Sequence, residues 1–229
     1  WSPLDFAQDH FYDREDFPRT FLNTIPEWAE AYPDKPFLVG EFGRASAALS
    51  YDTEGVELHI GIWSAPMNGA AGTAMTWWWD TYVHPNNLWD PLFRGVSAFF
   101  AGEDLRAQTW TRPETDFVER ARARVFGLHS PTAAYIWVLN RDYSPQYLES
   151  VYLDNLRAGA QDPLQIEFPM VEGALLVVSG FEPGSYTVEI WDTLSGTILE
   201  TQTTEAVDGN VQVALPAFNR DLALKIKAG

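Results

Sequence analysis

Residues 35–43 read KPFLVGEFG, an apolar run that ends in a carboxylate set between two glycines. Phe37, Leu38 and Val39 predict a buried strand because they are consecutive, apolar and bounded by a proline and a glycine. Glu41 follows where that strand ends. In α/β proteins, functional side chains collect where parallel strands end and loops begin. Glu41 is therefore a candidate site residue.

Strands and helices are predicted to alternate over residues 1–106. The expected strands are LDFAQDHFY (4–12), KPFLVGEFG (35–43) and GTAMTWWWD (72–80), and the expected helices cover 17–32, 56–67 and 87–100. Asp16 is suited to cap the first helix, whereas Pro26 leaves open whether that helix is interrupted. Alternation at a period of roughly 30–35 residues indicates βαβ units with parallel strands. Both a doubly wound sheet and the last three β/α units of a (β/α)8 (TIM) barrel fit this pattern, since a whole barrel needs about 250 residues.

From residue 107 to 229 the pattern changes to short strands with a period of two. The expected strands lie within 134–144, 174–196, 210–217 and 221–229, and the turn signals between them are EPGS, LSG and VDGN. This pattern predicts an antiparallel β-sandwich. Residues 115–128 fit a short helix or a linker equally well. The expected fold class is therefore α/β plus all-β, with one domain at 1–106 and a second at 107–229.

Composition limits the function classes. The 15 Lys and Arg against 32 Asp and Glu give a formal net charge of −17, which disfavours nucleic acid and anionic membranes as partners. Cysteine is absent, so disulfides and thiolate metal sites are excluded. The four histidines lack the spacing of a metal site, and we expect no metal or organic cofactor. The N-terminus has no Met, basic region or apolar signal block, which suggests that the chain begins within a longer protein.

All three predicted strands of the first half end in polar or aromatic side chains. The first ends with His10 and Tyr12, the second with Glu41, and the third with WWWD at 77–80. A lone histidine or glutamate is more often structural than catalytic. Three such ends at one edge of a parallel sheet shift the balance towards a site.

The sequence resembles a known family. VGEFG after an apolar strand, then a helix, then GTAMTWWWD, resembles the seventh and eighth strands of the catalytic barrel of glycoside hydrolase family 5 and its clan relatives. DHFYD resembles the sixth strand, and the likeness covers roughly residues 4–104. The later segments YTVEIWDTLSG and RDLALKIK are similar to the β-sandwich often appended to such barrels.

The resemblance implies a role for each strand end. Glu41 matches the catalytic nucleophile, and Tyr12 and His10 would lie beside it, with the phenol donating to the carboxylate. Period-two alternation places His10 and Tyr12 on one face of their strand.

The third strand end would hold the sugar. Trp78 and Trp79 are the expected stacking surface, and Asp80 would either bond sugar hydroxyls or cap a turn.

A retaining glycosidase needs a second carboxyl group about 5–5.5 Å from the nucleophile. In the family this acid/base is a Glu that follows an Asn at the end of the fourth strand. No Asn-Glu dipeptide occurs in the 229 residues. We therefore expect the chain to be inactive alone and to need a missing N-terminal half-barrel.

Two functions follow from these observations. The first is part of an extracellular or cell-surface retaining β-glycoside hydrolase that cleaves β-linked oligo- or polysaccharide such as glucan or mannan. The alternative is a non-catalytic carbohydrate-binding or structural module in which the β-sandwich carries the function. Aromatic candidates for that alternative are Trp137, Tyr143, Tyr147 and Trp191.

Overall fold

The structure, a computed structural model, describes residues 5–44 and 49–229. Two compact units are formed. The first comprises the described part of Trp1–Phe93 together with Tyr143–Glu167, and the second comprises Arg94–Asp142 and Phe168–Gly229. The chain passes from the first unit to the second within helix α3 (Trp89–Phe100).

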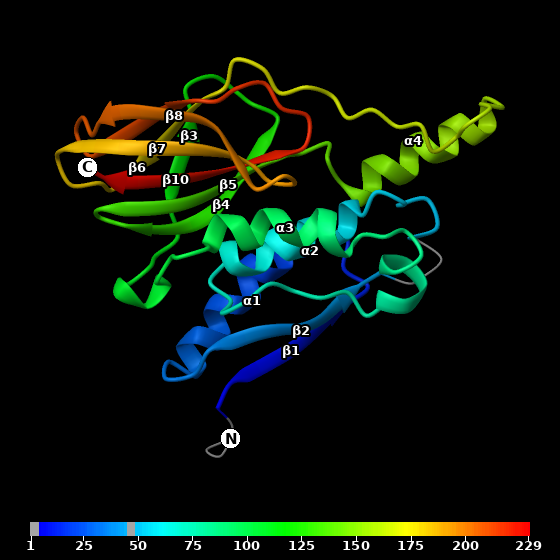
Figure 1. The fold of residues 1–229 in the computed structure, drawn as a ribbon, viewed down its shortest axis with the longest axis horizontal. Coiled ribbons are helices and arrows are strands. Elements are labelled where there is room, and N and C mark those ends of the chain that lie inside the picture. Colours follow the sequence, from blue (N-terminus) through cyan, green and yellow to red (C-terminus); the bar gives the residue numbers. More distant parts are fainter. Residues whose placement is uncertain (1–4, 45–48) are drawn as a thin grey trace. The chain divides into compact units, whose positions relative to one another are not determined.

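The first unit is built on two parallel strands. β1 (Ala7–Tyr12) pairs with β2 (Phe37–Gly43), and α1 (Phe17–Ala31) connects them, as Figure 1 shows in blue. This confirms the predicted strand–helix–strand unit. The side chain of Asp16 caps α1 by accepting from the backbone N–H of Arg19 at 3.2 Å. Pro26 lies inside α1 and does not interrupt it.

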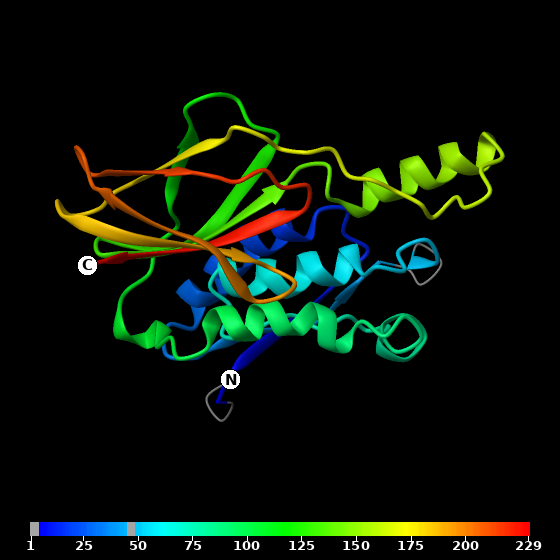
Figure 2. The same cartoon turned by 45° about the horizontal axis from the view of Figure 1, so that its top comes forward.

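Two helices cover one face of this sheet. Phe42 of β2 is fully buried, and its ring lies 5.0 Å from that of Phe17 and 6.2 Å from that of Phe21, both on α1. Helix α2 (Val56–Met67) brings Gly61 against the same ring, so closely that an added Cβ would overlap it. Both helices therefore pack on the face to which Phe42 points, and Figures 1 and 2 show them beside the sheet. Every residue of α2 is buried.

The predicted third strand, 72–80, is wrong beyond a single bridge. Thr76 forms one parallel bridge with Phe42, in which Phe42 N–H donates to Met75 O and Trp77 N–H donates to Phe42 O. The chain then leaves the sheet and forms a short π-helix, Trp79–Val83 (η2). The indole N–H of Trp78 donates to the carbonyl of Arg44 at 2.7 Å. A side-chain bond thus replaces the backbone ladder that a strand would have continued.

A helix that the sequence patterns did not predict belongs to the first unit. α4 (Pro145–Arg157) is capped by Ser144, whose hydroxyl accepts from Tyr147 N–H at 3.2 Å. Tyr152 on this helix stacks on Tyr51 with ring centres 5.4 Å apart. Tyr143 and Tyr147, two aromatic candidates for a sandwich surface, therefore lie in the first unit.

The second unit contains two antiparallel sheets. One has five strands in the order β4-β5-β10-β7-β8, and the other has three in the order β3-β6-β9. The strands are β3 (Glu114–Phe117), β4 (Ala123–Ser130), β5 (Ala133–Asn140), β6 (Leu175–Ser179), β7 (Ser185–Asp192), β8 (Thr197–Glu205), β9 (Asn210–Ala214) and β10 (Asp221–Ala228). A short 3-10 helix, η3 (Leu105–Ala107), precedes them. Residues 115–117 lie in β3 and residues 123–128 lie in β4, with a short connection at 118–122, so this segment is not a helix.

The two sheets share one core. Ile136 and Val138 of β5 and Val178 of β6 belong to the same cluster of fully buried side chains, together with Val213 of β9. Alternate residues of the strands therefore point inward, as in a β-sandwich. Trp137 is also fully buried, on the other side of β5, and its indole donates to Asp221 Oδ2 at 2.5 Å. Burial removes Trp137 from the aromatic candidates for ligand binding.

Trp191, the other sandwich aromatic, is engaged as well. The ring of Phe99 lies 5.7 Å from it, and the ammonium of Lys225 lies 4.6 Å from its centre. Trp191 is therefore a packing residue with a cation–π partner. Among the described residues, no helix has the length and apolarity needed to cross a membrane.

Candidate active site

A bulge in β2 decides where Glu41 points. Asp9 pairs with Val39 and His10 pairs with Glu41, so Gly40 is left without a partner in β1. An unpaired residue reverses the alternation that follows it. Without the bulge, Glu41 would point to the same face as Val39, which is buried under the helices. With it, Glu41 points to the opposite, open face.

Glycine suits the bulge because side chains occupy the space beside it. A Cβ on Gly40 would lie 2.7 Å from Gln8 Oε1 and 3.0 Å from His10 Nε2. Any larger residue would have to displace these side chains. Gly40 therefore permits both the bulge and the close approach of His10.

Three of the predicted site residues meet on the open face. The phenol of Tyr12 donates a short hydrogen bond to Glu41 Oε2, and His10 Nδ1 lies 3.2 Å from the same oxygen. The side chains of His10 and Glu41 are 40% and 27% exposed, so the group is open to solvent. Within residues 5–44 and 49–229, no partner is within hydrogen-bonding distance of the other oxygen, Oε1. The carboxylate is therefore fixed through one oxygen, while the other has no hydrogen-bond partner among the described residues.

The electrostatics of this group keep Tyr12 protonated. Partial burial, then the hydrogen bond to Glu41 and the charge of that carboxylate, raise the pKa of Tyr12 to about 12. Near neutral pH the phenol is therefore a constant donor to Glu41.

Trp78 is brought to the end of β2. A Cβ on Gly43 would lie 3.4 Å from Trp78 Cδ1, and Gly43 is also the register partner of Tyr12. The indole of Trp78 also donates to the Arg44 carbonyl. Trp78 therefore lies beside Gly43 and Arg44, which follow Glu41 by two and three positions in the sequence. Gly43 has a φ of 150°, a backbone conformation that favours glycine.

The other two residues of the third segment are exposed. Trp79, 54% exposed, and Asp80 begin η2, and Trp77 before them is 48% exposed. Their described contacts do not include the Glu41 carboxylate. The structure thus brings together His10, Tyr12 and Glu41 directly and Trp78 through the strand end, whereas no described contact joins Trp79 or Asp80 to this group.

Behind the strand end lies a buried charged network that the sequence patterns did not reveal. The backbone N–H and Nε of Arg44 donate to Glu57 at 3.0 and 2.5 Å, and Glu57 is only 1% exposed. Asp52, also buried, accepts from the N–H groups of Val56 and Glu57 at 2.7 and 2.9 Å and from the Tyr82 hydroxyl at 2.8 Å. Asp52 therefore caps α2 and ties η2 to it.

Burial is the main influence on these acids. It raises the pKa of Asp52, although the hydrogen bonds from Glu57 N–H and Tyr82 oppose the rise. It also raises the pKa of Glu57, against the opposing bonds and charge of Arg44. The network holds Arg44, and hence the acceptor of the Trp78 indole, in one place. Two acids flanking the start of an apolar helix were its only sequence signal.

No group of three or more His, Asp or Glu side chains in the described part of the chain is placed to hold a metal ion. The site thus contains a carboxylate held by the phenol of Tyr12, with His10 Nδ1 3.2 Å from the same oxygen.

No known protein family matches the sequence, and no curated protein does so either. Among solved structures, a glycoside hydrolase is similar with a TM-score of 0.53 and 9% identity, over 99% of this chain and 53% of that one. A GH30 endoxylanase from Clostridium papyrosolvens C71 gives a TM-score of 0.45 and 10% identity over 97% and 49%. A monomeric beta-xylosidase from Caulobacter crescentus CB15 gives 0.39 and 14% over 98% and 56%.

The first of these similarities shows that the chain has a glycoside hydrolase-like fold. It does not single out family 5. The chain spans about half the length of these solved structures.

Proposed function

We propose that the chain is part of a retaining β-glycoside hydrolase and that Glu41 is its nucleophile. The observation that carries the proposal is the arrangement around one carboxylate: Tyr12 and His10 both contact Glu41 Oε2, and the group lies on the open face where two parallel strands end. The glycoside hydrolase-like fold supports the same class.

In this proposal Oε1 of Glu41 attacks the anomeric carbon of the substrate. The bond from that carbon to the leaving oxygen breaks as a general acid protonates the oxygen, which gives a glycosyl ester on Glu41. Water then cleaves the ester, and the acid, now a base, takes the proton from water. The phenol of Tyr12 donates to Oε2 and His10 lies beside the same oxygen, so both hold the carboxylate in position.

The sugar would rest on the aromatic side chains of the third segment. Trp78 lies at the strand end and Trp79 is exposed, so both can offer a ring face to the apolar side of a pyranose. Asp80, also exposed, would accept hydrogen bonds from sugar hydroxyls. The proposed substrate is a β-linked oligo- or polysaccharide. A polymer too large to enter a cell implies an extracellular or cell-surface enzyme.

The proposed reaction also needs an acid/base, which we place in sequence outside these 229 residues. We assign residues 1–106 to the last three β/α units of a (β/α)8 barrel and residues 107–229 to an accessory β-sandwich, apart from the α4 segment Tyr143–Glu167, which belongs to the first unit. A Glu that follows an Asn is the expected acid/base, and the 229 residues contain no Asn-Glu pair. Hydrolysis would therefore need a half-barrel contributed by further sequence, and the 229-residue chain would be inactive alone.

Trapping of the intermediate tests the nucleophile. The native protein, purified from its source, would be treated with activated 2-deoxy-2-fluoro-β-glycosides of glucose, xylose and mannose, and the adduct located by peptide mass spectrometry. We expect the label on Glu41, and a loss of kcat of about 10³-fold or more in Glu41→Gln. Glu30→Gln, an exposed change on α1, should keep full activity. A label on another residue, or an active Glu41→Gln enzyme, would overturn the assignment.

A further inference from the structure

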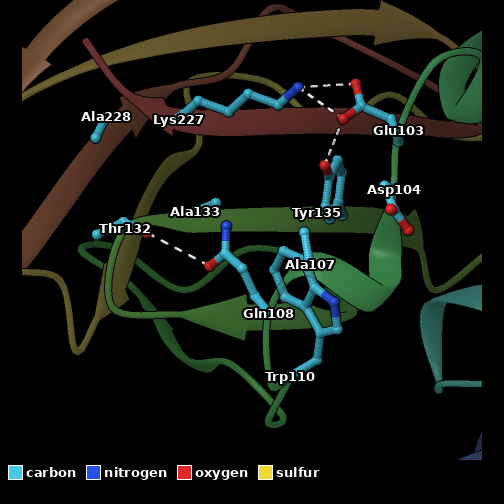
Figure 3. Close-up of a pocket in the computed structure, with 10 residues that line it drawn as sticks. All are labelled: Glu103, Asp104, Ala107, Gln108, Trp110, Thr132, Ala133, Tyr135, Lys227 and Ala228. Atoms are coloured by element: carbon cyan, nitrogen blue, oxygen red, sulfur yellow. Dashed lines mark hydrogen bonds and ion pairs between the residues drawn. The ribbon is translucent and has the colours of Figure 1, made fainter.

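The second unit contains a cavity of about 360 Å³, lined only by residues of that unit (Figure 3). Its walls combine aromatic and polar side chains: Trp110, Tyr135, Gln108, Thr132, Lys227 and Glu103. The size is within the range of small-molecule sites, about 300–1,000 Å³. None of these residues belongs to the group around Glu41.

Trp110 is a rigid aromatic wall. Its indole N–H donates to the carbonyl of Leu105 at 2.5 Å, and its ring centre lies 5.1 Å from that of Tyr135 at an angle of 60°. The side chain is half-buried. A tryptophan fixed by a hydrogen bond and a ring contact loses little conformational entropy when a ligand packs on it. Its ring matches the apolar C–H face of a pyranose.

The side-chain amide of Gln108 offers a donor to the cavity. Its Oε1 accepts from the Ser130 hydroxyl and from the Thr132 hydroxyl at 3.4 Å. In this orientation of the amide, neither hydroxyl is a partner of its nitrogen. In Figure 3 the amide nitrogen points into the space towards Ala133 and Lys227. Within the described part of the chain, no group accepts from this nitrogen.

The charges that line the cavity are already paired. Glu103 accepts from Lys225 at 2.8 Å, from Lys227 at 2.7 and 2.8 Å, and from the Tyr135 hydroxyl at 2.6 Å. Asp104 is paired with Arg106 at 2.8 Å. A free anion or cation would meet no unpaired opposite charge here. The side chain of Lys227 is nevertheless 44% exposed, so its ammonium has room for a further acceptor.

We propose that this cavity binds a neutral sugar residue. The pyranose packs on Trp110, one hydroxyl accepts from Gln108 Nε2, and another accepts from the Lys227 ammonium. The C–H face of a neutral sugar can pack on the aromatic wall, and its hydroxyls can accept from the polar side chains. Neither contact breaks the Glu103 ion pairs. The site does not depend on the role of Glu41, and it gives the β-sandwich a binding function of its own.

The test is carried out on the full chain with the Glu41→Gln change, so that hydrolysis is absent in every arm. Cellotetraose, xylotetraose and mannotetraose are titrated while the side-chain amide of Gln108 and the indole N–H of Trp110 are followed by ¹⁵N NMR. We expect at least one of these sugars to shift both signals along a saturable curve. The wild-type chain, which we expect to be inactive alone, should give the same curve.

Variants assign the binding to the cavity. Trp110→Ala should weaken binding about tenfold or more, and Trp110→Phe less, because the phenyl ring keeps part of the surface. Gln108→Ala should weaken it several-fold without a folding defect, since Gln108 is exposed. Leu199→Ala, an exposed change on β8 outside the cavity, should bind as the parent does.

Three results would overturn the proposal. The first is the absence of saturable shifts of Gln108 and Trp110 with all three sugars. The second is an equal loss of affinity in Leu199→Ala and Gln108→Ala. The third is binding that requires the Glu41 carboxylate, which would place the sugar at the Glu41 group instead. Failure of the Glu41 assignment alone, by contrast, would leave these shifts intact.

Discussion

His10 and Glu41 are register partners on parallel strands, with Nδ1 of one 3.2 Å from Oε2 of the other, although β2 must skip a residue to pair them. The skipped residue is Gly40. A regular strand would have turned Glu41 towards the helices beside Val39, where a carboxylate would lose its hydration. The bulge gives β2 two functions: Phe42 packs the core while Glu41 stays on the open face.

Gly40→Ala should therefore disturb the site more than the fold. The new Cβ would meet Gln8 Oε1 and His10 Nε2, which are the ends of side chains that can move. We expect a loss of stability of about 1 kcal/mol or less, because no backbone atom is among those close contacts. Activity of the complete enzyme should fall about tenfold, since His10 is pushed from Glu41.

The double variant Gly40→Ala with Gln8→Ala provides the control. It removes the closest contact and should recover part of the activity. Urea unfolding and kcat/KM measure the two effects. If Gly40→Ala leaves kcat/KM unchanged, His10 does not need its observed place.

Tyr12 should titrate unusually late. Its pKa of about 12 compares with an ordinary value of 10.0. Between these values the unfolded chain has released the phenolic proton and the folded chain has not, so rising pH favours unfolding. The stabilising effect is complete below pH 10 and is lost as pH rises towards 12.

Difference absorbance between the wild-type chain and Tyr12→Phe isolates this one phenol among nine tyrosines. Glu41→Gln should lower the pKa of Tyr12 towards 10, although burial keeps it somewhat higher. An ordinary titration of Tyr12 in the wild-type chain would contradict the hydrogen bond to Glu41.

Much of the fold could be predicted from local sequence patterns. Where the prediction is wrong, there is a physical cause. β1, α1, β2 and α2 follow from apolar runs, from the Asp16 cap and from helical spacing. The WWWD run has strong β propensity, but a bond from the Trp78 indole to the Arg44 carbonyl takes the place of a ladder. That partner lies 34 positions away in the sequence, so no local pattern reveals it.

β4 and α4, which were not predicted, have local signals in the sequence. In residues 119–125, ERARARV, alanines alternate with arginines, which is the period of a strand and not of a helix. Ser144 followed by Pro145 is a good helix start, and α4 begins there. His10, Tyr12 and Glu41 meet as expected, and their roles stay a prediction. The bulge at Gly40 stayed hidden because it depends on the register with β1.

The Arg44–Glu57 pair should be strongly coupled. Both side chains are largely buried, at 12% and 1% exposure, so Arg44→Met leaves a buried carboxylate without its charged partner, and only the backbone N–H of residue 44 still donates to it. We expect a loss of about 3–5 kcal/mol. Arg44→Met combined with Glu57→Leu should be more stable than Arg44→Met alone, because the uncompensated charge is gone. Urea unfolding of the four proteins in this cycle measures the coupling, and simple additivity would contradict it.

Glu103 should make the second unit sensitive to acid. Burial acts to raise its pKa, but the hydrogen bonds from Lys225, Lys227 and Tyr135 outweigh burial and lower the pKa to about 2, from an ordinary value of 4.5. Below pH 4.5 the Glu103 carboxyl is protonated in the unfolded chain, whereas in the folded chain it stays ionised until about pH 2. The stabilising effect is therefore complete above pH 4.5 and is lost as pH falls to 2.

The difference between 4.5 and about 2 corresponds to roughly 3 kcal/mol at neutral pH. Glu103→Gln should lose that stability at pH 7 and should also lack the wild-type decline between pH 4.5 and 2. Glu205→Gln, an exposed change on β8, serves as the matched control and should follow the wild-type curve. Thermal unfolding across this pH range makes the comparison. If Glu103→Gln and the wild-type chain decline in parallel, the lysines do not hold Glu103 ionised, and Lys227 would then be free to contact a charged ligand in the cavity.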